Sequence, residues 1–244
     1  MAGPLRDLES RASANLERHL KHNAYPGRGL VVGRARDDAG WLLVYWIMGR
    51  SESSRARRFV VQGTTLRTEP TDPAKIWSPE LVIYEAMLEL PGLHLVGNGD
   101  QTRTARDRLA AGGRFEDALA TRAHEPDAPN WTPRITALLD LRATPRLALS
   151  LLKASPADPA RTDRSLYRPS PPPPGFGFGI TTYRGDGDPL PSFEGEPLWL
   201  ALEASPEATL DRYWDALDPG NRVALAVKHV APAGSRILVR NRFA

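Results

Sequence analysis

The chain of 244 residues is 41% hydrophobic and 25% charged, which is enough apolar material for a packed core and excludes disorder of the whole chain. It contains no cysteine, so disulfides, thiolate metal sites and a cysteine nucleophile are excluded. The 32 Lys and Arg residues exceed the 29 acidic residues too slightly, with a net charge of +3, to indicate nucleic-acid binding.

No segment approaches the roughly 18 consecutive apolar residues that a membrane-spanning helix needs. The longest apolar run, residues 41–48, has the length of a strand. Residues 1–22 are charged throughout and lack the apolar centre of a secretory signal. We therefore expect a cytoplasmic protein that does not bind a membrane.

The N-terminal part of the chain predicts a helix and then a sheet. Residues 29–36, 37–40 and 41–48 are typical of strand, turn and strand, and 58–62 and 65–68 continue the sheet. Because the second strand is almost wholly apolar, we expect both of its faces to be covered. Before it, spacings of three and four predict an amphipathic helix whose apolar residues are Leu5, Leu8, Ala12, Leu16 and Leu20.

A second helix is predicted from Ser78-Pro79-Glu80, which combines a cap residue, a proline at the first position and an acid in the first turn. Pro91-Gly92 ends it, and its apolar stripe consists of Leu81, Tyr84, Met87 and Leu88. The next expected elements are a strand at 94–96, helices at 102–111 and 114–122 broken by Gly112-Gly113, and strands at 135–141 and 147–152.

Residues 154–175 are rich in proline and predict a surface excursion between core elements, with polyproline II structure at Pro171–Pro174. The elements expected after it are strands at 177–183 and 198–203, a capped helix at 205–217, and strands at 223–230 and 236–239. This mixed order predicts an α+β fold with largely antiparallel sheets.

Several well-known sites are absent from the sequence. It contains no Walker-type phosphate loop, no dinucleotide-binding glycine spacing, no His-Glu-x-x-His and no Gly-x-Ser-x-Gly. Its five histidines do not form a group of three. We therefore expect neither a metal ion nor a cofactor.

Four polar segments border the predicted strands and helices. Residues 25–29 bring an arginine to the start of a strand, and 49–58 leave the apolar strand with several arginines and serines. Residues 97–102 place glycines and polar side chains before a helix, and 124–134 combine two acids, an amide and an arginine. Loops rich in arginine and hydroxyl groups suit phosphate, and glycine lets backbone approach a ligand. Each segment alone also fits a solvent-exposed turn.

The four segments and three stretches outside them contain motifs in a fixed order. They are Tyr-x-Gly-Arg-Gly at 25–29 with Val-Val-Gly-Arg at 31–34, Gly-Arg-Ser-x-x-x-Arg at 49–55, Pro-x-x-x-x-Tyr at 79–84, Asn-Gly-x-x-Thr at 98–102, Glu-x-Asp at 125–127 with Thr-Pro-Arg-Ile at 132–135, and Thr-Thr-Tyr at 181–183. This ordered set resembles the archaeal-type IMP cyclohydrolases and their bacterial relatives. The resemblance implies one domain over 1–244, with 1–24 as a helical extension and 154–175 as a proline-rich surface insertion.

The resemblance also implies a four-layered αββα sandwich, similar to the N-terminal-nucleophile hydrolases but without self-processing. The sequence agrees, because Met1 is followed by Ala2 and the first strand begins after residue 28. The implied reaction closes 5-formamidoimidazole-4-carboxamide ribonucleotide to IMP with loss of water, in purine biosynthesis. The implied partner is a purine ribonucleotide, with no nucleic acid, and a homo-oligomer remains open.

Carried over to this sequence, the family pattern places Arg55, Tyr84 and Glu125 around the reacting groups. Arg55 would polarise the formyl oxygen, and the choice of base between Glu125 and Tyr84 stays open, since Tyr84 also fits a core position. The hairpin should bring Arg28 and Arg50 to one sheet edge as a phosphate clamp. The full set of implied substrate-binding residues is Tyr25, Arg28, Arg50, Asn98, Gln101, Thr102, Asn130 and Arg134.

Two alternative functions remain open at the level of sequence. One is a non-catalytic nucleotide-binding or regulatory protein, against which the intact set of Arg55, Tyr84 and Glu125 argues. The other is a different amide or nucleotide hydrolase on the same fold. The proline-rich segment supports that alternative, because it could reshape the pocket.

Overall fold

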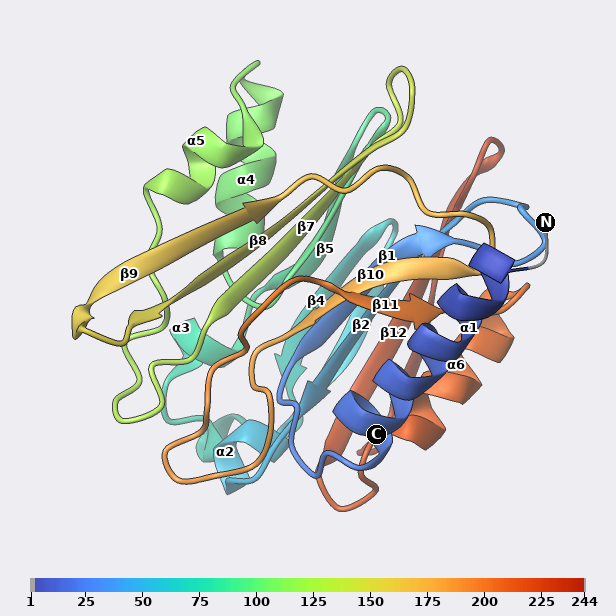
Figure 1. Cartoon of the computed structure of the whole chain (residues 1–244). Helices are drawn as coiled ribbons and strands as arrows, with labels where there is room; N and C mark the ends of the chain where they lie inside the picture. The colour runs from blue at the N-terminus through green and yellow to red at the C-terminus, as the bar shows by residue number, and fades with distance from the viewer. Residues whose placement is uncertain (1–2, 244) are drawn as a thin grey trace.

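The computed structural model describes residues 3–243 and contains two antiparallel sheets (Figure 1). The six-stranded sheet has the order β11 (Leu198–Ala201), β10 (Phe176–Thr181), β1 (Gly29–Arg34), β2 (Trp41–Met48), β12 (Arg222–Ala231) and β13 (Gly234–Asn241). The seven-stranded sheet has the order β3 (Arg57–Gln62), β4 (Thr65–Pro70), β5 (Glu85–Leu90), β6 (Leu93–Gly97), β7 (Arg134–Asp140), β8 (Arg146–Ser155) and β9 (Asp158–Tyr167). The expectation of largely antiparallel sheets is confirmed.

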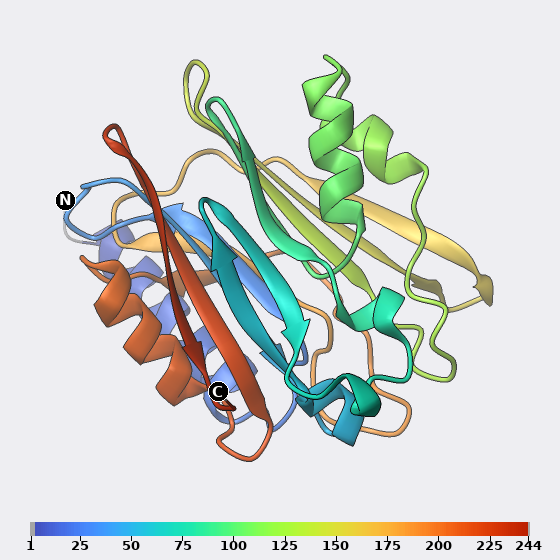
Figure 2. The same cartoon turned by 180° about the vertical axis from the view of Figure 1, so that it is seen from behind.

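Helices cover the outer face of each sheet, as the two views show (Figures 1 and 2). On the six-stranded sheet these are α1 (Gly3–Leu16), its π-helical continuation η1 (Glu17–Lys21) and α6 (Pro206–Ala216). On the seven-stranded sheet they are α4 (Gln101–Ala110) and α5 (Phe115–Ala120). Three short pieces cluster at one end: α2 (Glu52–Arg55), η2 (Pro73–Lys75) and α3 (Pro79–Val82). No helix within residues 3–243 is long and apolar enough to cross a membrane.

Strand β2 lies between two hydrophobic cores, which explains its wholly apolar sequence. Leu43, Tyr45 and Ile47 pack into the core between the sheets. The alternate residues of β2, among them Val44 and Trp46, pack beneath η1 and α6. All eight residues of β2 are buried, so the prediction that both faces are covered is confirmed.

The helix predicted from residue 78 to Pro91 is wrong. Only one turn forms, α3, and the chain then extends into β5 between β4 and β6. The backbone N–H of Tyr84 donates to Thr68 Oγ1 at 2.9 Å, and Thr68 N donates to the carbonyl of Tyr84. The apolar residues of β5 face both cores, with Met87 on one and Leu88 on the other. A strand buried on both faces gave the same spacing as an apolar helix stripe.

The proline-rich segment contains regular structure that the sequence did not predict. Its residues 158–167 form the edge strand β9, which pairs with β8 and is mostly exposed. Alternating charged and polar side chains and Pro159 are typical of a strand whose outer edge stays unpaired. The rest, up to residue 175, crosses to β10 without helix or strand.

A buried ion pair joins the two sheets inside the sandwich. Lys228 of β12 is fully buried, and its Nζ donates to Glu89 Oε2 of β5 at 2.6 Å and to the Thr64 carbonyl at 3.0 Å. Burial lowers the pKa of Lys228 because it penalises the charged ammonium. The ammonium therefore depends on Glu89 as its counter-charge.

Replacing Glu89 with Ala should lower the free energy of unfolding by about 1–3 kcal/mol, because the Lys228 ammonium is left buried with only a carbonyl partner. The matched control is Glu85→Ala on the same strand. Glu85 pairs with the half-exposed Arg103 at the surface, so its loss should amount to less than about 1 kcal/mol. Urea denaturation measures both, and equal losses would contradict a role for this pair in holding the sheets together.

Candidate functional site

A cavity of about 260 Å³ lies at the end of the sandwich where β1 begins and β2 ends. This volume is slightly below the roughly 300 Å³ at which typical small-ligand pockets begin. Its walls come from both sheets, from α2 and α3 and from the loops around residues 25–28, 50–51, 125–132 and 183–190. The lining residues are Tyr25, Gly27, Arg28, Met48, Arg50, Ser51, Ser54, Arg57, Ser78, Leu81, Val82, Glu125, Asp127, Asn130, Thr132, Tyr183 and Leu190.

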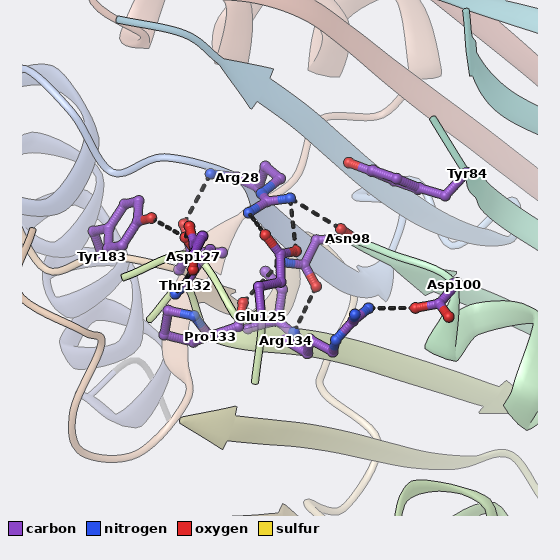
Figure 3. A network of polar contacts seen from close by, with 12 residues as sticks. Arg28, Tyr84, Asn98, Asp100, Glu125, Asp127, Thr132, Pro133, Arg134 and Tyr183 are labelled. Atoms are coloured by element: carbon purple, nitrogen blue, oxygen red, sulfur yellow. Dashed lines mark hydrogen bonds and ion pairs between the residues drawn. The ribbon is translucent and has the colours of Figure 1, made fainter. Parts of the chain in front are cut away.

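A buried ion pair between Arg28 and Glu125 forms one wall of the cavity (Figure 3). The contact is a two-pronged fork, with Nη1 donating to Oε1 at 2.9 Å and Nη2 donating to Oε2 at 2.8 Å. Nη1 also donates to the Asn98 carbonyl at 3.2 Å. Glu125 is 2% exposed, and burial raises the pKa of its carboxyl while Arg28 opposes the rise. A carboxyl with a raised pKa suits proton transfer near neutral pH.

Beside this pair, Tyr183, Thr132 and Asp127 form a chain of hydroxyl and carboxylate contacts. An ionised Asp127 can only accept, so the Thr132 hydroxyl donates to it and accepts from the Tyr183 hydroxyl. Asp127 also accepts from the Thr132 backbone N–H at 2.6 Å, which closes the loop that holds Glu125. Burial raises the pKa of Tyr183 well above its ordinary value, so its phenol stays protonated.

Arg57, the first residue of β3, is a buried cation without an acidic partner among residues 3–243. Its Nε donates to the Ser54 carbonyl at 2.9 Å and its Nη2 to the Met48 carbonyl at 3.3 Å. Its Nη1 is buried and has no hydrogen-bond partner in the described part of the chain. Buried charges are normally paired, so an arginine without a counter-charge in the described part of the chain is exceptional.

Arg50 lies at the mouth of the same cavity. Its guanidinium carbon is 5.0 Å from the centre of the Tyr25 ring, and Tyr25 in turn stacks on Tyr183. Arg50 Nη1 donates to Asp186 Oδ1 at 2.5 Å on the loop that follows β10. The structure thus brings Arg28 and Arg50 to one end of the sheet, as the hairpin predicts.

The comparison with known proteins bears on this arrangement. A family model described as IMP cyclohydrolase-like protein matches residues 25–234, which include every residue of the cavity. The chain belongs to the IMP cyclohydrolase-like family. A search of curated proteins found no match.

Four of the predicted site residues in this IMP cyclohydrolase-like protein form a buried network behind the cavity and do not line it. Asn98 Oδ1 accepts from Gln101 Nε2 at 2.9 Å and from the Ile135 backbone at 2.8 Å. Gln101 Oε1 accepts from Arg134 Nη1 at 2.8 Å, and the Thr102 hydroxyl donates to the Gly99 carbonyl. These side chains bond to one another and to backbone groups inside the protein, and they support Arg28 through the Asn98 carbonyl (Figure 3).

Two of the three predicted catalytic residues also lie outside the cavity lining. Arg55 Nε donates to the Gly49 carbonyl at 2.8 Å and its Nη2 to Asn221 at 3.2 Å. The Tyr84 hydroxyl is 2.7 Å from that of Tyr45 in the core between the sheets, on the opposite side of Arg28 from Tyr183 in Figure 3. Their catalytic roles stay predictions. Of the predicted residues, the cavity contains Tyr25, Arg28, Arg50, Glu125 and Asn130.

Four residues of the cavity are not among the individual site residues predicted from the sequence, namely Arg57, Asp127, Thr132 and Tyr183, although Arg57 belongs to the arginine-rich segment 49–58 that suits phosphate. Asp127, Thr132 and Tyr183 belong to the Glu-x-Asp, Thr-Pro-Arg-Ile and Thr-Thr-Tyr motifs. The motifs indicate these positions, but the sequence does not show that the three side chains contact one another. Within residues 3–243, no group of three or more His, Asp or Glu side chains has the arrangement of a metal site.

Replacing Arg28 with Met should leave the Glu125 carboxylate buried without its counter-charge. Near neutral pH this should lower the free energy of unfolding by about 3–5 kcal/mol. The loss should shrink towards about pH 4, where the carboxyl is protonated in the folded and the unfolded protein alike, and grow as the pH rises. Urea denaturation at both pH values, against wild type, measures the difference.

The double variant Arg28→Met/Glu125→Leu is the control for this pH dependence. It removes both charges, so its loss of stability relative to wild type should not grow as the pH rises. A pH-independent loss in the single variant would contradict the assignment of its cost to the Glu125 charge.

Proposed function

We propose that this protein is an IMP cyclohydrolase, which closes 5-formamidoimidazole-4-carboxamide ribonucleotide to IMP with release of water. The observation that carries the proposal is the cavity itself, with one guanidinium that has no acidic partner among residues 3–243 and a buried carboxylate held against a second guanidinium. Family membership supports the same reaction. The four-layered sandwich related to N-terminal-nucleophile hydrolases is part of this proposal.

Ring closure requires a close approach and two proton transfers. The carboxamide nitrogen attacks the formyl carbon, and protons from the carboxamide and formamido nitrogens reach the formyl oxygen, which leaves as water. Holding the two arms in contact can supply up to about 7–11 kcal/mol of the barrier when the entropy is lost on binding. The protein then has to move protons and stabilise charge on one oxygen.

Glu125 and Arg28 carry these two tasks in our proposal. Both oxygens of Glu125 accept from Arg28, but a carboxylate has about four lone-pair sites and can still accept a proton. Arg28 uses three of its five N–H groups on Glu125 and Asn98, which leaves donors for the formyl oxygen. The fork fixes the carboxylate in one orientation while it takes and returns the proton.

The substrate phosphate binds at the other part of the cavity in our proposal. Arg57 supplies an unused N–H there, and Arg50 stands at the mouth. Ser51, Ser54 and Ser78 line the same cavity. Arg57 takes the phosphate role that the sequence suggested for Arg28, because Arg28 already has a carboxylate partner.

Purified protein should convert the formylated substrate to IMP, followed by ultraviolet absorbance, and the rate should survive dialysis against a chelator. No metal is required in our proposal, because side chains supply the proton acceptor, the donors to the formyl oxygen and the contacts to the phosphate. Loss of turnover on chelation, with recovery on adding zinc or magnesium, would contradict this mechanism.

Glu125→Gln is the matched control, since it keeps the shape and removes the proton acceptor. Its kcat should fall by a factor on the order of 10² to 10⁴, with substrate binding largely kept. Calorimetric binding of IMP by wild type without any turnover would instead support the nucleotide-binding alternative.

Arg57→Gln should weaken IMP binding about tenfold to hundredfold while leaving inosine binding nearly unchanged, because a charge-assisted contact to phosphate is lost. Arg55→Gln, two positions earlier, should leave IMP affinity within about twofold, since its guanidinium bonds outside the cavity. Isothermal titration calorimetry with both ligands measures these changes.

Arg57→Lys is the control that separates loss of the phosphate contact from a structural effect of Arg57→Gln. It keeps the charge but loses the fork, so its affinity for IMP should lie between those of wild type and Arg57→Gln. Equal losses for IMP and inosine in Arg57→Gln would place Arg57 away from the phosphate.

A further inference from the structure

A second cavity, of about 440 Å³, opens at the far end of β7. Arg134 begins β7 beside the first site, and Asp140 ends β7 at this second cavity, about 20 Å away for seven extended residues. The walls come from α4, α5, β7, β8 and the segment after β9, which lie together in Figure 2. The volume is within the roughly 300–1,000 Å³ of small-molecule sites.

The floor of this second cavity is apolar. Leu138 of β7 and Ala148 of β8 present the outer face of the sheet, and Phe115 of α5 packs against them. Leu109 of α4 is partly buried against the same cluster and completes the floor. A flat or aliphatic body placed here would leave water without exposing any buried polar group.

The rim is charged and carries an excess of two positive charges. Four arginines and two acids line it, and each acid serves two arginines. Glu116 accepts from Arg114 and, at 2.6 Å, from Arg168. Asp140 accepts the fork of Arg142 at 2.9 and 3.0 Å and lies 3.5 Å from Arg146.

The proline-rich segment forms one wall. Pro169, Ser170 and Pro171 line this cavity, and none of residues 154–175 lines the first cavity. Proline fixes its φ angle and has no N–H, so this wall is rigid. The segment therefore shapes a second site, and does not reshape the first as the sequence suggested.

We propose that this second cavity binds a phosphate monoester with an apolar body. The body rests on the Leu109, Phe115 and Leu138 floor, and the phosphate lies among the rim arginines. A monoester carries a charge of about −1.5 to −2 near neutral pH, which matches the excess of two positive charges on the rim. Planar guanidinium forks match phosphate oxygens in geometry.

The test uses 1-naphthyl phosphate as the probe, titrated into the wild-type chain and into Arg146→Gln/Arg168→Gln by calorimetry. Both arginines are more than half exposed, so the double variant should fold. The double variant should bind the probe at least about tenfold more weakly at the second cavity, seen as one class of sites in the titration. The matched control is Arg161→Gln, which changes an exposed arginine of β9 outside the second cavity and should bind the probe like wild type.

Three further arms make the outcome decisive. Leu109→Glu, which puts a negative charge on the floor, should weaken the probe as strongly as the double arginine variant. Inorganic phosphate and 1-naphthol should each bind more weakly than the probe, since each offers half of the recognition. Equal affinity of wild type and the double variant, or of probe and inorganic phosphate, would overturn the proposal.

The result is independent of the function proposed for the first cavity. Arg57→Gln should retain probe binding at the second cavity, and the double variant should retain ring-closing activity. Loss of probe binding in Arg57→Gln alone would place the probe in the first cavity and refute the second site.

Discussion

The ion pair between Arg28 and Glu125 is the contact on which the site depends, because it connects the two sheets at the end that contains the cavity. Arg28 immediately precedes β1 of one sheet, and Glu125 lies on the loop that leads to β7 of the other. A buried ion pair contributes little net stability, since the desolvation of both charges offsets their attraction. Its value here is positional: it places a carboxylate and a guanidinium in a fixed geometry at the cavity wall.

The network behind the cavity gives that geometry its rigidity. Asn98 follows β6, and its side chain bridges to the Pro133 carbonyl and the Ile135 N–H at the start of β7, while its own carbonyl accepts from Arg28. Arg134 extends the network to Gln101 and Asp100. These polar residues therefore contact Arg28 from behind the cavity, and their shared hydrogen bonds fix the position of its guanidinium.

The sequence predicted the elements whose signals are local. The 37–40 turn, the Gly112-Gly113 break and the Ser205 cap each fix a boundary by backbone chemistry, and the structure confirms all three. It failed at β5, where burial on both faces imitates a helix stripe, and at β9, whose pairing with β8 is a tertiary contact. For the site, the sequence marked the right loops but could not distinguish residues that line the cavity from those that support it.

The inward position of Arg57 could have been predicted from the sequence. In β3, Arg57 and Phe59 are buried, while the alternate residues Arg58 and Val60 are less so, as the geometry of a strand requires. Once Phe59 is assigned to the core, Arg57 must point inward as well. An inward arginine with no acid in reach carries a desolvation penalty that the protein alone does not offset. In the function proposed here the substrate phosphate offsets that penalty on binding, and the site thereby favours a charged nucleotide over an uncharged nucleoside.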